Sequence, residues 1–274
     1  MLVFYDASEL RRLERLRQEF VANVSHELKT PLAVIKANIE TLLEGAVEDR
    51  QHRGRFLEQI ANQADRLHAL ILDMLSLAQI ESGTEVFEYH AVSLNEAIRS
   101  CLERQRARAE AKKQHLEFIP LSLREGEALA EPGSAAREDP RPPGVRGQGE
   151  GESQDLAAWA DEEAIGQILD NLVDNTIKYT PDGGTISLSC QDEQTKIHIL
   201  VRDTGIGIAE SYLARIFERF YRVDTARSRE LGGTGLGLAI VKHLVQAMHG
   251  TIQATSQVGK GTSFSIRLPK APSG

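Results

Sequence analysis

The chain has 274 residues, 41% of them hydrophobic, and its 40 acidic and 32 basic side chains give a formal net charge of −8. At about 100–200 residues per domain, this length predicts two domains. An acidic chain without a long basic run argues against non-specific nucleic-acid binding, and two distant cysteines, Cys101 and Cys190, argue against a disulfide framework or a zinc site.

No apolar run reaches the roughly 18 residues that cross a bilayer, and no signal peptide is visible. We therefore expect this chain to be soluble and cytoplasmic. Residues 2–5 (Leu-Val-Phe-Tyr) predict a strand that runs through a capping segment at residues 6–9 into a helix. A lone strand is not stable, so we interpret residues 1–8 as the remnant of an upstream sensor domain, with a frayed terminus as the alternative.

Two amphipathic helices are predicted next, one from residue 9 and one over residues 56–78, joined by a polar turn at 45–54. Their apolar residues recur at three- and four-residue steps: Leu10, Leu13, Leu16, Phe20, Val24, Leu28, Ile35, Ile39 and Leu42, then Phe56, Ile60, Ala64, Leu67, Ile71, Met74 and Ala78, with Gly83 ending the second helix. Such a pair forms an antiparallel hairpin with one apolar seam per helix. Two copies would bury these seams as a four-helix bundle, which predicts a homodimer.

The pattern beyond residue 83 predicts an α/β sandwich in which helices cover one face of a mixed sheet. Strands are expected at 87–92, 116–123, 185–190, 196–203, 251–256 and 262–268, helices at 94–112, 161–179 and 236–249, and a partly helical lid at 209–234. Residues 124–155 are rich in glycine, proline and acidic residues and nearly free of apolar ones. They predict a disordered surface insertion.

A histidine on the first helix has unusual neighbours. Residues 25–31 read Ser-His-Glu-Leu-Lys-Thr-Pro, and the helical period places His26 opposite the apolar stripe, in solvent. An adjacent carboxylate, Glu27, can hold the proton of one ring nitrogen and leave the other as a nucleophile. Pro31 is expected to bend the helix below His26. By itself, His26 would be an ordinary surface histidine.

Residues 171–180 and 203–207 carry polar groups that suit a nucleotide. On the predicted helix, the amide oxygens of Asn171 and Asn175 suit a Mg²⁺ ion shared with phosphates, and Lys178 adds positive charge. Asp203 ends a predicted strand, where its carboxylate can accept a hydrogen bond from an exocyclic amine. Alone, these segments would be a polar helix face and a common Asp-Gly turn.

Two glycine-rich segments follow. Residues 232–238 (Gly-Gly-Thr-Gly-Leu-Gly-Leu) run into a predicted helix, and backbone N–H groups at such a start can hold a phosphate. Residues 258–262 (Val-Gly-Lys-Gly-Thr) are not a P-loop, because Ala254 stands where a glycine is needed and Gly261 follows Lys260.

In order and spacing, residues 20–31 together with these nucleotide segments resemble the sensor histidine kinases of two-component systems. The start of the chain, where residues 2–5 run into the first helix, resembles the junction of a PAS-type sensor domain with the dimerisation helix in kinases of the phosphate-regulon type. The resemblance covers roughly residues 10–123 and 156–269 and departs from the family at the 124–155 insertion. It implies that His26 is phosphorylated, that Glu27 is the general base, and that Thr30 positions water when the partner is dephosphorylated.

The resemblance also implies a Bergerat-type ATP site that uses Mg²⁺. Asn175 would bind the metal, Asn171 and Lys178 the phosphates, and Tyr179 and Asp203 the adenine, with support from Thr262. The other residues implied in nucleotide binding are Gly205, Gly207, Phe220, Arg222, Gly233, Thr234, Gly235, Leu236 and Gly237. Arg222 lies in the lid motif at 216–222 and would neutralise the γ-phosphate.

The expected organisation is a dimerisation and histidine phosphotransfer domain at 9–83 and a catalytic ATP-binding domain at 84–270. The expected function is autophosphorylation of His26 by ATP, followed by transfer to an aspartate of a response regulator, together with regulator phosphatase activity. We expect the parent protein to be anchored in the inner membrane. The alternatives are a client-binding ATPase of the same superfamily, a non-enzymatic dimeric scaffold, and a serine/threonine kinase of related fold.

Overall fold

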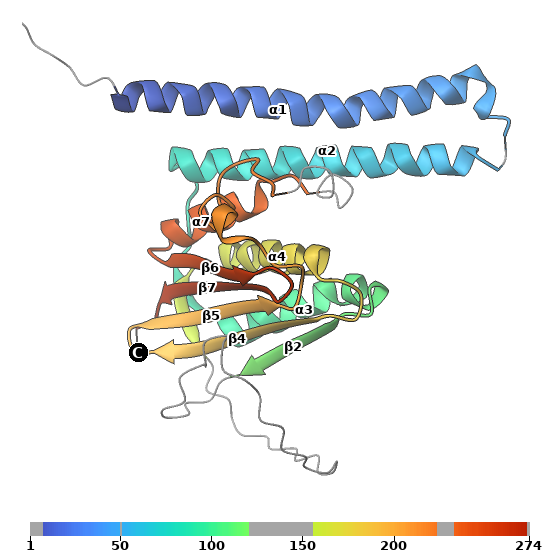
Figure 1. The fold of residues 1–274 in the computed structure, drawn as a ribbon. Coiled ribbons are helices and arrows are strands. Elements are labelled where there is room, and N and C mark those ends of the chain that lie inside the picture. Colours follow the sequence, from blue (N-terminus) through green and yellow to red (C-terminus); the bar gives the residue numbers. More distant parts are fainter. Residues whose placement is uncertain (1–7, 50, 121–155, 224–232, 273–274) are drawn as a thin grey trace, which may run out of the picture. The chain divides into compact units, whose positions relative to one another are not determined.

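A computed structural model describes residues 8–49, 51–120, 156–223 and 233–272 (Figure 1). The chain divides into two compact units, one of Met1–Val86 with Ile208–Ala247 and the other of Phe87–Gly207 with Met248–Gly274. The strand predicted at residues 2–5 and the insertion predicted at 124–155 lie outside the described residues. Among the described helices, none is long and apolar enough to span a bilayer. The predicted domain boundary after residue 83 stays a prediction.

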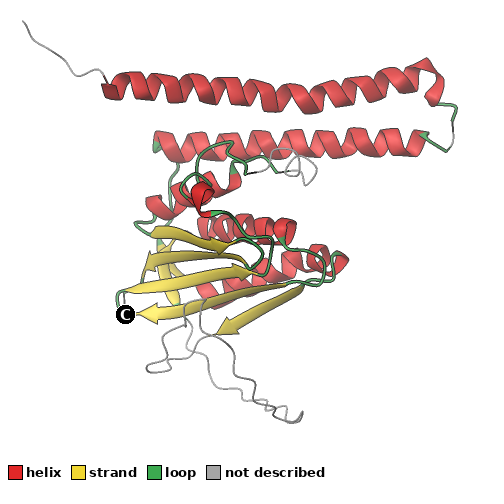
Figure 2. Cartoon of the chain, viewed as in Figure 1, coloured by secondary structure: helices red, strands yellow, loops and turns green. Residues whose placement is uncertain are grey.

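The first unit is built on a helical hairpin. Helix α1 (Ser8–Thr41) continues through Pro31 into a π-helical turn (Leu42–Ala46), and helix α2 (Arg53–Ser82) returns alongside it (Figure 2). Gly83 ends α2 with a left-handed φ of 65°, and its N–H donates to the carbonyl of Ile80 at 3.2 Å. The predicted hairpin and its terminating glycine are therefore confirmed, but the connection is shorter than the predicted 45–54, because the π-helical turn reaches Ala46 and α2 begins at Arg53. Helices α5 (Glu210–Leu213) and α7 (Gly237–Ala247) complete this unit.

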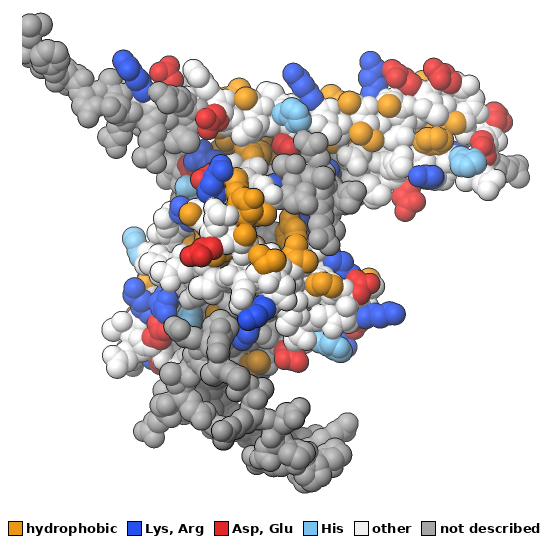
Figure 3. Space-filling view, viewed as in Figure 1, with side chains coloured by type: hydrophobic (Ala, Val, Ile, Leu, Met, Phe, Trp, Pro, Cys, Tyr) orange, Lys and Arg blue, Asp and Glu red, His pale blue; other side chains and the backbone are white. Residues whose placement is uncertain are grey.

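The hairpin leaves many large apolar side chains exposed, and part of this surface is visible in Figure 3. The exposed ones are Val21, Leu32, Val34, Ile39 and Leu43 on α1 and its π-helical end, and Leu57, Ile71, Leu72 and Leu75 on α2. Leu70 and Leu77, in contrast, are buried. A single hairpin therefore buries one seam and leaves other apolar stripes uncovered.

The second unit is centred on a five-stranded sheet of order β2-β4-β5-β7-β6. Its strands are β2 (His115–Pro120), β4 (Thr185–Glu193), β5 (Lys196–Asp203), β6 (Thr251–Gln257) and β7 (Gly261–Pro269). Only the β2–β4 pair is parallel, so the predicted mixed sheet is confirmed. Helices α3 (Leu94–Ala111) and α4 (Glu162–Tyr179) pack together and on this sheet, on one face of it (Figure 2).

Local sequence explains these elements. Ile197, Ile199 and Val201 alternate along β5 and are buried, as a half-buried strand requires. Helix α4 begins where the side chain of Asp161 accepts a hydrogen bond from the N–H of Ala164 at 2.9 Å. Ser93 caps α3 in the same way, through the N–H of Glu96 at 3.2 Å.

One strand of the structure was not predicted from the sequence. Strand β3 (Ala157–Ala160) pairs antiparallel with β1 (His90–Ser93) as a separate two-stranded sheet. Its four residues, Ala-Ala-Trp-Ala, lack the β-branched alternation that marks a strand. Strand β1 also begins at His90 rather than at residue 87.

Candidate functional site

The predicted site residues divide between the two units. His26, Glu27 and Thr30 lie on α1 of the first unit. The same unit contains Phe220, Arg222 and the glycine-rich residues 233–237. Asn171, Asn175, Lys178, Tyr179, Asp203, Gly205, Gly207 and Thr262 lie in the second unit.

His26 is exposed on α1, as the helical period predicts. The hydroxyl of Thr30 donates to the backbone carbonyl of His26 at 3.1 Å, so Thr30 lies on the same face of the helix. The imidazole is therefore accessible to a reactant from solvent.

The carboxylate of Glu27 contacts two arginines. Its Oε2 lies 3.0 Å from Nη2 of Arg222 and 3.7 Å from Nη2 of Arg66 on α2. The side chain of Arg222 is only 6% exposed. Within the described ranges, no hydrogen bond joins Glu27 to the imidazole of His26, so its role as general base stays a prediction. Arg66 was not predicted, because it is far from Glu27 along the chain and belongs to no motif.

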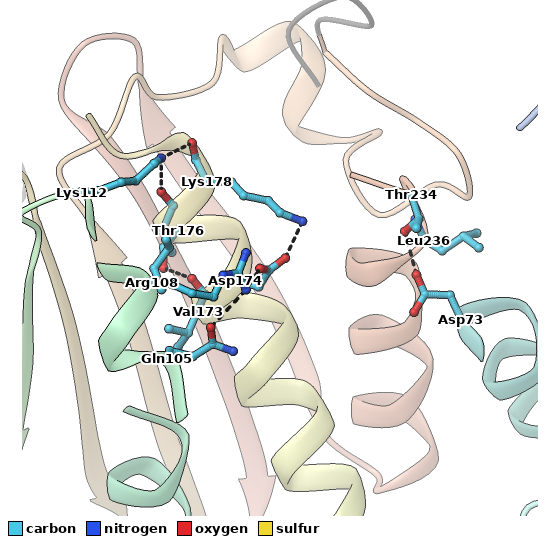
Figure 4. Close-up of polar contacts among 11 residues, drawn as sticks. Asp73, Gln105, Arg108, Lys112, Val173, Asp174, Thr176, Lys178, Thr234 and Leu236 are labelled. Carbon is cyan, nitrogen blue, oxygen red and sulfur yellow. Dashed lines mark hydrogen bonds and ion pairs between the residues drawn. The ribbon is translucent and has the colours of Figure 1, made fainter. Parts of the chain in front are cut away.

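The glycine-rich segment forms the start of α7. The first backbone bond of the helix runs from the N–H of Ile240 to the carbonyl of Leu236 at 2.9 Å. The N–H groups of residues 237–239 therefore have no acceptor inside the helix, and such groups can bind an anion. Thr234 accepts from the N–H of Leu236 at 3.3 Å, and its hydroxyl donates to Asp73 of α2 at 2.7 Å (Figure 4).

Asp203 lies at the end of β5 and is 5% exposed. Its Oδ1 accepts from the N–H of Gly205 at 2.7 Å and from the N–H of Thr262 at 3.2 Å. Burial raises the pKa of the Asp203 carboxyl, and these two hydrogen bonds oppose the rise. Within the described residues, Oδ2 accepts no hydrogen bond, so it can accept one from a ligand. The N–H of Thr262 therefore holds Asp203, and the role of Thr262 in adenine binding stays a prediction.

The loop at 203–207 is held closely by its neighbours. The N–H of Ile206 donates to the carbonyl of Tyr179 at 3.2 Å, which ties the loop to the end of α4. A Cβ atom on Gly205 would lie 2.6 Å from Oδ1 of Asp203. Only glycine fits there without displacing the carboxylate.

Gly261 was not predicted to matter near Asp203, because the sequence indicated it only within the rejected P-loop. It has a φ of +103°, and a Cβ atom there would lie 1.9 Å from the carbonyl oxygen of Asp203. The turn between β6 and β7 can approach Asp203 only with glycine at this position. The segment Gly-Lys-Gly-Thr just before a strand was the available signal.

We expect Gly261→Ala to destabilise the second unit by about 3 kcal/mol or more, since it combines left-handed strain with a backbone clash. Gly259→Ala is the matched control, because Gly259 also has a positive φ of +78° but nothing within 4 Å of its Cβ position. It should cost only about 1–2 kcal/mol. Calorimetric unfolding of the full chain measures both variants, and equal losses would contradict the clash.

Helix α4 presents the remaining predicted residues on a partly exposed face. The side-chain amide of Asn171 donates to the carbonyl of Gln167 at 2.9 Å. Figure 4 shows the pair of Lys178 and Asp174, in which Nζ lies 2.6 Å from Oδ2. Asn175 is half-buried one turn before Tyr179. Its amide oxygen suits a Mg²⁺ ion that keeps several waters and is shared with phosphates. The residues present therefore fit a magnesium nucleotide.

Comparison with known proteins gives two family matches. Residues 16–83 match the His Kinase A (phospho-acceptor) domain, and residues 160–272 match the histidine kinase-, DNA gyrase B- and HSP90-like ATPase. The sensor histidine kinase WalK of Bacillus subtilis is 38% identical over 269 residues, which are 97% of this chain and 39% of WalK. The phosphate regulon sensor protein PhoR of Pseudomonas aeruginosa is 35% identical over 272 residues, which are 99% of this chain and 54% of PhoR.

Solved structures show the same fold. Histidine kinase ThkA in complex with the response regulator protein TrrA has a TM-score of 0.68 at 24% identity, covering 97% of this chain and 65% of that one. Full-length ShkA in complex with AMPPNP has a TM-score of 0.61 at 26% identity, and the match covers 93% of this chain and 46% of the ShkA chain. The chain spans about two fifths to three fifths of the length of the curated relatives that it matches.

Proposed function

Because the chain belongs to the sensor histidine kinases of two-component systems, we propose that it is the autokinase core of such a protein, which transfers the γ-phosphoryl group of ATP to His26 and then to an aspartate of a response regulator. The observation that carries the proposal is the exposed imidazole of His26 within the segment that matches the phospho-acceptor domain.

In the proposed reaction, the lone pair of a ring nitrogen of His26 attacks the γ-phosphorus in line with the bond to ADP. An N–P bond forms, the bond from the β–γ bridging oxygen to the γ-phosphorus breaks, and the ring proton passes to a base, for which Glu27 is the candidate. Catalysis is then mostly positioning and charge neutralisation. An aspartate of the regulator takes the phosphoryl group in the second step.

The nucleotide-binding residues have separate proposed roles. Oδ2 of Asp203 accepts from the adenine amine, while Thr262 and Gly205 hold Oδ1. Asn175 is the proposed Mg²⁺ ligand, and the ion, when bound, would neutralise phosphate charge. The N–H groups of the first turn of α7 are proposed to bind phosphate oxygens.

Arg222 is the proposed partner of the γ-phosphate. In this structure its guanidinium binds Glu27, the residue next to His26. The guanidinium thus pairs with the residue that follows the proposed phosphoacceptor, and it can neutralise a phosphate delivered to His26. Thr30, whose hydroxyl oxygen keeps acceptor capacity, is the proposed water-positioning residue in regulator dephosphorylation.

The test is incubation with ATP labelled at the γ-phosphate, followed by a purified receiver domain. We expect the chain to take up label that acid removes and alkali does not, as a phosphohistidine requires, and to pass it to the receiver domain. Acid-stable label would instead indicate a serine/threonine kinase, and ATP hydrolysis without any protein label would indicate a client-binding ATPase.

We further propose that two copies of the chain pair through the exposed apolar stripes of α1 and α2. On α1 and its π-helical end, Leu32, Ile39 and Leu43 follow one another at helical spacing on one face, and Leu57, Ile71 and Leu75 do so on α2. A second copy would cover both stripes, as in a four-helix bundle.

Leu75→Glu should weaken this dimer by at least about tenfold, because two symmetry-related carboxylates would be buried in the apolar seam. Leu75 is 54% exposed in the single chain, so its substitution should leave the hairpin itself folded. Asn62→Glu places the same charge on the exposed polar face of α2 and is the control. Light scattering over a concentration series measures the mass, and an unchanged Leu75→Glu dimer would contradict this interface.

A further inference from the structure

We propose that Arg108 is a positioning residue for nucleotide phosphates, because it shares the carboxylate of Asp174 with Lys178 and so frees Lys178 to bind them. This inference rests on the proposed function, since it deepens the role of Lys178. It assigns a function to a residue of α3 that lies outside every nucleotide motif of the sequence.

The geometry is a carboxylate between two cations. Nη1 of Arg108 lies 2.5 Å from Oδ1 of Asp174, and Nζ of Lys178 lies 2.6 Å from Oδ2 of the same side chain (Figure 4). The side chains of Asp174 and Lys178 are only 25% and 18% exposed, whereas that of Arg108 is 51% exposed. Each carboxylate oxygen of Asp174 therefore pairs with a different cation. Lys178, the proposed phosphate ligand, is the more buried of the two cations.

The Arg108–Asp174 pair is one of three contacts that basic side chains make from α3 or its C-terminal cap to α4. One turn earlier, Arg104 donates to Oδ2 of Asp170 through Nε at 3.2 Å and Nη2 at 2.9 Å. One turn later, Lys112 donates to the backbone carbonyls of Ile177 and Lys178 at 2.8 and 3.2 Å. Arg104 and Arg108 of α3 and Lys112 at its C-terminal cap are spaced by one helical turn, and so are their partners on α4. The two helices are thus held in register, and Arg108 is positioned by that register.

The pairing of Lys178 with Asp174 opposes phosphate binding. In this structure the ammonium group that phosphates would bind is held by a carboxylate, and that carboxylate would repel a triphosphate nearby. If Lys178 left Asp174 without replacement, a mostly buried carboxylate would lose its cation, which is unfavourable. Arg108 prevents this loss, because it keeps Oδ1 of Asp174 paired while Lys178 turns to the phosphates.

The two cations suit these different roles. A lysine has a flexible stem and a compact charge, so it can exchange one anion for another. An arginine has a planar group with several fixed donors, and that of Arg108 also donates to Oε1 of Gln105 at 3.2 Å. We therefore assign Lys178 as the mobile cation and Arg108 as the fixed one.

Titration calorimetry of the full chain with Mg-ATP, and separately with adenosine, tests the proposal. Arg108→Gln should weaken ATP binding about twofold to fivefold, the range of a partly exposed charge pair. Asp174→Asn should tighten ATP binding by a similar factor, because Lys178 is released and a repelling charge is lost. Adenosine has no phosphates, so its affinity should stay unchanged in both variants.

The decisive variant is Arg108→Gln combined with Asp174→Asn. If Arg108 acts through the carboxylate of Asp174, its substitution should have no effect on ATP affinity once Asp174→Asn has removed that carboxylate. A loss that persists in the double variant would mean that Arg108 touches the phosphates directly, which overturns the positioning role. Arg106→Gln is the matched control, since Arg106 lies on the same helix and pairs only with Glu103 and Glu110 of α3 among the described residues.

Failure of the proposed function and failure of the role of Arg108 give different results in this experiment. If the unsubstituted chain binds neither ATP nor adenosine, the proposed function fails. If it binds both and Arg108→Gln binds ATP as tightly as the unsubstituted chain, only the role of Arg108 fails. Circular dichroism of each variant confirms that the fold is retained.

Discussion

His26→Gln should abolish uptake of label from γ-labelled ATP. Glutamine is similar in size and polarity, but its amide nitrogen is not a nucleophile, so no N–P bond can form. Because His26 is exposed and Thr30 binds its backbone carbonyl rather than its ring, the substitution should not disturb α1. Nucleotide affinity should also stay unchanged, since the proposed ATP ligands are other residues.

His68→Gln provides the control for this experiment. His68 is an exposed histidine on α2, outside the motif at 25–31, and its substitution should leave labelling at the level of the unsubstituted chain. Label that persisted in His26→Gln and disappeared in His68→Gln would move the phosphoacceptor to α2. Loss in both variants would point to a defect of the hairpin instead.

Asn175→Ala should reduce labelling at least about a hundredfold, because the proposed Mg²⁺ ligand is lost and the phosphates are no longer held for attack. Asn175 is half-buried on α4, and alanine is the best helix former, so the helix should remain packed. The dimer should also persist, because the proposed interface lies on α1 and α2.

Two measurements separate a loss of metal binding from a loss of structure. The initial rate of labelling is measured over a series of Mg²⁺ concentrations, and the mass of the variant is measured by light scattering. Asn62→Ala, the same change at an exposed position of α2, should match the unsubstituted chain in both. A normal labelling rate in Asn175→Ala would remove Asn175 from the metal site.

Much of the fold could be predicted because the signals are local. The three- and four-residue steps of apolar residues mark α1 and α2, and Gly83 ends α2 with the left-handed conformation that glycine favours. The alternation of Ile197, Ile199 and Val201 marks β5 and places Asp203 at its end. Periodicity also placed His26 in solvent, because the helix is regular there.

The missed features depend on contacts between distant residues. Glu27 and Arg222 are separated by 195 positions, and no local pattern indicates that they bind each other. Gly261 is required by the carbonyl of Asp203, which only the pairing of β5 with β7 brings close. Strand β3 has too little β propensity to be detected alone and is defined by its partner β1.

The environment of Asp203 determines which purine base its carboxylate can bind. Two N–H groups occupy Oδ1, so only Oδ2 remains for a ligand. While the carboxyl is ionised, Oδ2 can only accept a hydrogen bond. It therefore attracts the amine of adenine and repels the carbonyl that guanine presents at the equivalent ring position. Because burial raises the pKa of Asp203, acidification protonates this oxygen earlier than that of an ordinary aspartate. The protonated group would donate instead of accept, and the preference between the two purines would be inverted. The fidelity of the proposed adenine contact therefore depends on a single proton.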